Sequence, residues 1–182
     1  MSDLKSAAEV LAFWKEAGPD KWYKKDEAFD RAIRDNFLAT YEAAAESRLS
    51  SWEKEPDTAL ALIIVLDQFP RNMFRGSARA WVADPLAREV AGRAISQGSD
   101  KAVDRTLRVF FYLPFMHSEQ LADQDYCVEL CRALGNEDNL KYAEIHRDVI
   151  KRFGRFPHRN TVLGRETTPD ERAFLASGGF AG

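Results

Sequence analysis

Three short segments of this 182-residue chain gather side chains that can bind or transfer charge. The first reads DQFPRNMFRG (Asp67–Gly76), the second FMHSE (Phe115–Glu119) and the third RFGRFPHRN (Arg152–Asn160). The first and third share a pattern, because each follows an expected helix with Phe-Pro and then with Arg and Asn. Arginine suits planar, two-pronged recognition of phosphate or carboxylate. The three segments are therefore predicted to meet in one arginine-rich polar pocket.

The predicted ligand-binding set consists of polar residues in or near these segments. Its members are Asp67, Gln68, Arg71, Asn72, Arg75, His117, Glu119, His146, Arg152, Arg155, His158, Arg159 and Asn160. Among them, His117, His158 and Asp67 are the candidates for acid–base catalysis, since imidazole and perturbed carboxyl groups can exchange protons near neutral pH. The sequence leaves open whether any reaction is catalysed.

A structural role for the arginines is the alternative interpretation. Ion-pair networks resemble functional sites in composition, and cations also favour the C-terminal ends of helices. Arg71 and Arg152 stand where such ends are expected, and both can bond terminal carbonyls there. Asp67, Glu119 and Glu144 are carboxylates that can neutralise the remaining arginines. The sequence does not decide between a binding site and such a network.

Two further chemistries have less support. Ser118 beside His117 suggests a nucleophile and its base, but a serine at this place is explained by capping the next helix, expected at about 119–134. No Gly-x-Ser-x-Gly elbow is present. A metal site built from His117, Glu119, His146 and His158 has no ligand spacing that selects it. No metal and no other cofactor is predicted.

Two residue types are expected mainly in the core. Cys127 and Cys131 lie four residues apart, on one face of an expected helix, where they act as small apolar side chains. No disulfide is predicted between them, because their Cβ atoms diverge along the helix axis. His146 shares a face with Val149 and Ile150 and should point inward, either as a satisfied core histidine or as the floor of a pocket.

Helical periodicity dominates the chain and positions these segments. It predicts an all-α domain of seven to nine helices, stacked as antiparallel pairs over residues 1–176, with a flexible tail at 177–182. Pro70 should end the helix that precedes the first segment, because a proline pushes the residue before it out of the α region. Thr168, Pro169 and Glu171 are typical of a capped helix start.

Composition excludes several classes of function. A formal charge of −3 without a lysine-rich block gives no electrostatic support for nucleic-acid binding. The longest apolar runs, ALALIIVL and VFFYLPFM, are far too short to span a membrane. The first residues lack the apolar core of a signal peptide. We therefore expect a cytoplasmic protein that binds neither membranes nor nucleic acids.

The three segments also resemble the motifs of a known family. LDQFPRNMFRG, FFYLPFMHSE and RFGRFPHRNTVLGRETTPDE are similar, in this order, to the signature segments of the mainly bacterial domain of unknown function 924. The resemblance covers nearly the whole chain. It implies a tetratricopeptide-like α-α superhelix, and it implies no established activity.

Two functions from different classes follow. In the first, the arginines and histidines line a pocket that holds an anionic small molecule, a phosphate or a carboxylate, with or without acid–base catalysis. In the second, the domain is an interaction module that clasps an acidic peptide. A deep, closed cavity favours the first function, and an open groove favours the second. The oligomeric state is not predicted.

Overall fold

The computed structural model describes residues 4–180, and over that range the chain is all-α, without a β-strand. Contacts divide the chain into two compact units, Met1–Phe111 and Tyr112–Gly182. Seven of the α-helices in the described range have eight or more residues, which agrees with the predicted number. The prediction of one domain with a flexible tail at 177–182 concerns cooperativity and mobility, and it stays a prediction. Ala181 and Gly182 lie outside the described residues.

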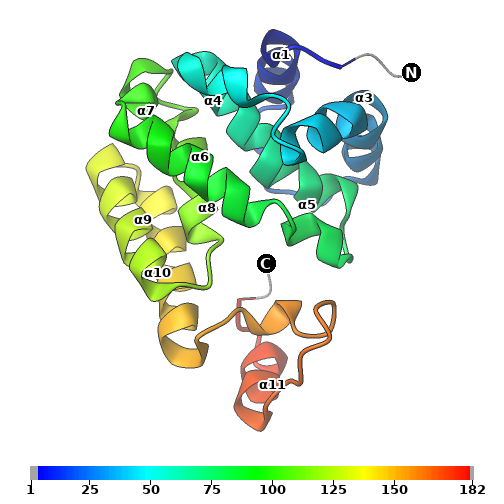
Figure 1. Ribbon diagram of the computed structural model, residues 1–182. Coiled ribbons are helices and arrows are strands. Elements are labelled where there is room, and N and C mark those ends of the chain that lie inside the picture. Colours follow the sequence, from blue (N-terminus) through cyan, green and yellow to red (C-terminus); the bar gives the residue numbers. More distant parts are fainter. Residues whose placement is uncertain (1–3, 181–182) are drawn as a thin grey trace. The chain divides into compact units, whose positions relative to one another are not determined.

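The first unit contains the elements that carry the first motif (Figure 1). Its α-helices are α1 (Ala7–Ala17), α2 (Pro19–Trp22), α3 (Glu27–Ala45), α4 (Pro56–Ile63), α5 (Phe69–Met73), α6 (Asp84–Ser96) and α7 (Ser99–Ala102). A π turn, η2 (Ile64–Gln68), joins α4 to α5, and 3-10 turns are η1 (Ser50–Lys54), η3 (Ala78–Trp81) and η4 (Arg108–Phe111).

Aromatic side chains fill the core of the first unit. An apolar stripe at a spacing of four residues on α3 is buried throughout, from Phe29 to Tyr41. Phe69 contacts this stripe through Phe37, with ring centroids 4.9 Å apart, and it contacts Trp14 of α1 at 5.7 Å. Large buried rings contribute both apolar area and favourable edge contacts. Phe69 therefore fixes the first motif to the core of the first unit.

The prediction that Pro70 ends its helix was wrong. The chain stays helical through Met73, because η2 makes one wider turn between α4 and α5. Across this turn the N–H of Phe69 donates to the carbonyl of Ile64, five residues earlier. Pro70 has no backbone N–H to donate. It lies in the first turn of α5, where a backbone N–H has no partner within the helix, so its absence costs no hydrogen bond. The π turn also leaves Asp67 and Gln68 buried.

The second unit carries the other two motifs. Its helices are α8 (Leu113–Met116), α9 (Leu121–Leu134), α10 (Glu137–Phe153) and α11 (Pro169–Ala176), with a 3-10 turn, η5 (Pro157–Arg159). Helices α9 and α10 pack side by side as a hairpin (Figure 1). Gly135 ends α9 in the left-handed conformation, and Asn136 caps α10.

The start of α9 differs from the prediction. The helix begins at Leu121, two residues later than expected, with Gln120 as its N-cap. Ser118 does not cap the helix itself. Its hydroxyl accepts the N–H of Gln120 at 3.2 Å and donates to Asp123 at 2.6 Å, so it orders the turn that leads into α9. Glu119 is thereby released from the helix and can bond elsewhere.

The start of α11 confirms the predicted capping box. Thr168 accepts the N–H of Glu171, and Glu171 accepts the N–H of Thr168 at 2.8 Å. Within residues 4–180, no helix combines the length and the apolar composition needed to cross a bilayer. The tetratricopeptide-like superhelix and the cytoplasmic location stay predictions.

Candidate functional site

In the first unit, Arg71 serves as the centre of a buried ion-pair group. Its guanidinium donates to both carboxylate oxygens of Asp84, at 3.1 and 3.0 Å. It also lies 3.3 Å from the carboxylate of Asp67, which is completely buried, and bonds the Asp67 carbonyl. The amide of Gln68 donates to the same Asp67 carboxylate at 2.6 Å. This geometry matches the structural interpretation of Arg71, which was expected to bond a backbone carbonyl at a helix end, and it adds ion pairs with Asp67 and Asp84.

The other polar residues of the first motif also hold helix α3. Arg75 donates to both oxygens of Asp30, at 2.8 and 3.0 Å. Asn72 donates to Asp30 as well, at 2.8 Å. The first motif thus fastens α5 to α3 through a single carboxylate. Its predicted role in ligand binding stays a prediction, as does the single pocket shared by all three motifs.

Within the second unit, the second and third motifs do meet. The N–H of Phe156 donates to Glu119 at 2.8 Å, across 37 residues of chain. Arg165 donates to both oxygens of Glu119, at 2.7 and 3.0 Å. Burial alone would raise the pKa of Glu119, but the hydrogen bonds from Arg165 and Phe156 hold it below its ordinary value. Glu119 is therefore a carboxylate that joins the two motifs, and it already forms an ion pair with Arg165.

A second carboxylate, Glu171, organises the rest of the third motif. Arg155 donates to both of its oxygens, at 2.6 and 2.9 Å, and Asn160 donates to one of them at 3.1 Å. Asn160 in turn accepts a hydrogen bond from Arg165 at 2.9 Å. The hydrogen bonds from Arg155 are the largest cause that lowers the pKa of Glu171, to about 2. Arg155 and Asn160 thus belong to one continuous polar network.

All three histidines of the chain lie together in the second unit, around two phenylalanine rings. We call the rings of His117, His146 and His158 the histidine cluster. The centroids of His117 and His146 are 6.4 Å apart. Phe156 lies 5.7 Å from His146 and 5.6 Å from His158. Phe180 also lies against the cluster, 4.2 Å from His146 and 5.5 Å from His158. Residues from the end of α8, from α10, from η5 and from the segment after α11 therefore converge at one place.

Two members of the histidine cluster, His146 and His158, are held in their neutral forms. His146 points inward as predicted, and its Nδ1 lies 2.7 Å from the carbonyl of Tyr142, which assigns the proton to Nδ1. Burial, and then the charges of His117 and Arg159, lower the pKa of His146 to about 3. Burial and the positive charge of Arg159 lower the pKa of His158 to about 4. The Nδ1 of His158 is buried without a hydrogen-bond partner.

Arg159 is the buried cation beside this cluster. It donates to the carbonyl of His117 at 3.1 Å, and its guanidinium lies over the ring of Phe156 at 4.5 Å. Stacking of this kind fixes the plane of a guanidinium. The remaining predicted residue, Arg152, lies elsewhere, exposed over the rings of Phe153 and Phe174.

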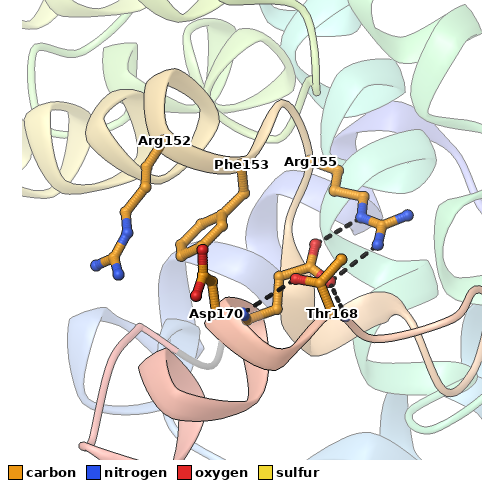
Figure 2. A pocket seen from close by; sticks show the side chains of 6 residues that line it. Arg152, Phe153, Arg155, Thr168 and Asp170 are labelled. Carbon is orange, nitrogen blue, oxygen red and sulfur yellow. Dashed lines mark hydrogen bonds and ion pairs between the residues drawn. The ribbon is translucent and has the colours of Figure 1, made fainter.

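Arg152 and Arg155 border a groove of about 420 Å³ between the end of α10 and the start of α11. Figure 2 shows the two arginines extending on either side of Phe153, with Thr168 and Asp170 below them. Arg155 is bonded to Glu171 in this groove, whereas no ion pair is formed by Arg152 among the described contacts. The groove therefore carries acidic as well as basic groups.

The alternative chemistries find little support in the geometry. The hydroxyl of Ser118 donates to Asp123 and accepts the N–H of Gln120, which gives it a structural role in the turn before α9. Over residues 4–180, no three His, Cys, Asp or Glu side chains are grouped as a metal site requires. Glu144 pairs with Arg132 on the surface, not with a motif arginine. Cys127 and Cys131 are free and buried, which confirms both predictions for them.

Several residues of these networks were not predicted as site residues. They are Asp30, Asp84, Arg165, Glu171 and Phe180. Arg165 follows the third motif directly, so its arginine was a usable signal. Glu171 was recognised only as part of a capping box. No local signal marked Asp30 or Phe180, since their partners are distant in sequence.

Comparisons with known proteins found a matching family and a similar solved structure. A model of the family described as bacterial protein of unknown function (DUF924) matches residues 10–179. A solved structure of a protein of unknown function from Agrobacterium tumefaciens has 52% sequence identity and a TM-score of 0.92. The match covers 94% of this chain and 97% of that chain. No curated protein matches the sequence. The chain belongs to the bacterial family of unknown function DUF924.

Proposed function

We propose that the second unit binds a small anion, a phosphate or a carboxylate, beside the histidine cluster. The observation that carries the proposal is the convergence of His146, His158 and Arg159 around Phe156, with His117 beside His146. A buried, stacked guanidinium offers an anion a fixed plane of N–H donors. The imidazoles add further polar atoms that can donate once they are protonated.

The charges around the cluster support this assignment. Two carboxylates of the second unit, Glu119 and Glu171, each accept hydrogen bonds on both oxygens from another arginine. Arg165 and Arg155 therefore neutralise them. Burial is the largest cause that lowers the pKa of His146 and His158, and the positive charge of Arg159 lowers both further. A site whose field opposes protonation of a base is a site whose field attracts an anion.

Proton uptake is expected to accompany binding. An anion next to His146 and His158 favours their charged forms, so it raises the pKa values that burial and Arg159 hold at about 3 and about 4. By linkage, the affinity for the anion rises as the pH falls. His158 is the candidate for acid–base catalysis, because its Nδ1 is buried without a hydrogen-bond partner. Asp67 is engaged by Arg71 and Gln68 instead.

A second candidate is the clasping of an acidic peptide in the groove lined by Arg152 and Arg155. It is favoured by one observation, the exposed guanidinium of Arg152 over the rings of Phe153 and Phe174. A peptide carboxylate could pair with this arginine while its side chain packs on the rings. Asp170 and Glu171 line the same groove and oppose an acidic partner. The histidine cluster is therefore the preferred site.

The experiment that tests this proposal is a titration of the protein with inorganic phosphate, sulfate and succinate, followed by NMR of the histidine rings. We expect the ring signals of His146 and His158 to shift with saturation, together with uptake of protons. Arg152→Gln serves as the matched control, since it removes a guanidinium of the same unit outside the cluster. Saturable shifts that vanish in Arg152→Gln but persist in Arg159→Gln would move the site to the groove. Absence of saturable shifts with every anion would refute anion binding by this unit.

A further inference from the structure

The ring of Phe180 packs against two rings of the histidine cluster, those of His146 and His158. Its centroid lies 4.2 Å from that of His146, 5.5 Å from that of His158 and 6.2 Å from that of Phe156. Phe180 also packs against the small core around Val149. It remains partly exposed, unlike Phe156, which is completely buried. Three aromatic rings thus surround a fourth ring that has a path to solvent.

Two glycines bring Phe180 to this position. After α11 ends at Ala176, Gly178 adopts a φ of +78°, a conformation that L side chains rarely take. A Cβ on Gly179 would lie 2.5 Å from the ring of Phe174, so a side chain there would force that ring to move. The N–H of Gly179 donates to the carbonyl of Phe174 at 3.0 Å. The return of the chain across α11 is therefore specified by the sequence.

This environment suits an aromatic ring better than it suits a bare anion. Rings pack favourably edge-to-face or tilted at centroid separations of about 4.5–7 Å, a range that the contacts with His158 and Phe156 fall within. The cation of Arg159 lies close by, over the face of Phe156 at 4.5 Å. Phe180 and Arg159 thus both contact the ring of Phe156, so a ring in the place of Phe180 would share this neighbour with a guanidinium that can bind an anionic substituent.

We infer that the ligand of the histidine cluster is an aromatic anion, a carboxylate or a phosphate borne on an aromatic ring, and that its ring replaces Phe180. This inference rests on the proposed anion binding and narrows it to one class of ligand. Phe180 then acts as an internal surrogate for the ligand ring. Binding requires the C-terminal segment to release the cluster, while the charge of the ligand is held by Arg159.

Competition with Phe180 sets the expected size of the effect. A ligand that binds only the uncovered state has its affinity reduced by the fraction of molecules in that state. The contacts of one ring with a few aromatic neighbours should hold most molecules in the state in which Phe180 covers the histidine cluster. About a tenth of the molecules then have an uncovered cluster. Removal of the Phe180 ring should therefore tighten the binding of aromatic anions about tenfold.

The test is calorimetric titration of the wild-type protein and of Phe180→Ala with matched pairs of ligands. Benzoate is compared with acetate, and phenyl phosphate with inorganic phosphate, so that the ring and the type of charge are varied separately. Leu163→Ala is the matched control, because it shortens another partly exposed apolar side chain of the same unit. We expect benzoate or phenyl phosphate to bind Phe180→Ala about tenfold more tightly than the wild type or Leu163→Ala.

A second measurement uses the wild-type protein alone, in case Phe180→Ala does not fold. Saturation with the aromatic anion should displace the ring of Phe180 and shift the His146 ring signals more than acetate or inorganic phosphate does. Two results would overturn the inference without refuting the proposed anion binding. Aromatic anions would bind the wild type and Phe180→Ala equally tightly, or they would bind no more tightly than acetate and inorganic phosphate. If none of the four ligands binds either protein, the proposed function fails as well.

Discussion

Replacement of Arg71 by alanine should destabilise the first unit strongly. The change removes the cation that binds two carboxylates, Asp67 at 3.3 Å and Asp84 at 3.0 Å. Asp67 is completely buried and would keep only Gln68 among these partners. Breaking a buried pair by removing one partner costs about 3–5 kcal/mol. For a chain of this size, that cost corresponds to a fall in melting temperature on the order of 10 °C.

Arg75→Ala is the internal control for this prediction. Arg75 also binds a carboxylate with two hydrogen bonds, but its side chain is 40% exposed, against 21% for Arg71. Its partner Asp30 also keeps the hydrogen bond from Asn72. Pairs of this exposure contribute about 0–1 kcal/mol. Chemical denaturation and thermal unfolding followed by circular dichroism measure both variants. A cost for Arg71→Ala as small as that for Arg75→Ala would refute the structural role assigned to Arg71.

Two further predictions concern pH. The unfolded chain protonates His146 near its ordinary pKa of 6.5, whereas the folded chain does so only near 3, so the free energy of unfolding should fall as the pH drops from about 6.5 to about 3. Urea unfolding of His146→Gln should show a weaker loss over that range, and an unchanged pH dependence would contradict the buried neutral histidine. The pKa of Glu171 is lowered from 4.5 to about 2, so its ion pair stabilises the fold above about pH 4.5 and is lost as the pH falls to about 2. The stability of Glu171→Gln should therefore approach that of the wild type in acid, and a constant difference between pH 7 and pH 2 would argue against this ion pair.

Features that depend on neighbouring residues could be predicted from the sequence. The capping box at Thr168 and Glu171 follows from side chains three residues apart, and the buried stripe of α3 follows from its spacing of four. The inward direction of His146 follows from the same periodicity. In each case the deciding contacts lie within a few residues, so the local pattern contains the relevant physics.

Features that depend on distant partners could not be predicted in the same way. Arg165 and Glu119 lie 46 residues apart, and Arg75 and Asp30 lie 45 apart, so nothing in the local sequence pairs them. The concentration of arginines therefore indicated an anion site as readily as a network. The prediction at Pro70 was wrong for another reason. The residue before a proline usually avoids the helical conformation, but here the wide turn before Pro70 keeps the helix continuous.

The position of Phe180 could not be predicted from the neighbouring residues either. The sequence SGGF suggests a frayed end, since glycines favour disorder. In the structure the same glycines allow the chain to pass close to Phe174 and to deliver a ring to His146. The candidate site in the second unit is therefore completed by a residue that no motif contains.

The most direct test of anion binding at the histidine cluster is calorimetric titration of the wild type, Arg159→Gln and Arg152→Gln with inorganic phosphate and benzoate, at pH 6 and pH 8. We expect the wild type to bind these anions more tightly at pH 6 than at pH 8, because binding takes up protons. Loss of charge-assisted hydrogen bonds from Arg159 should weaken binding about tenfold or more, whereas Arg152→Gln should bind as the wild type does. Equal affinity of Arg159→Gln and the wild type, or no binding of either anion to the wild type, would contradict anion binding at the histidine cluster.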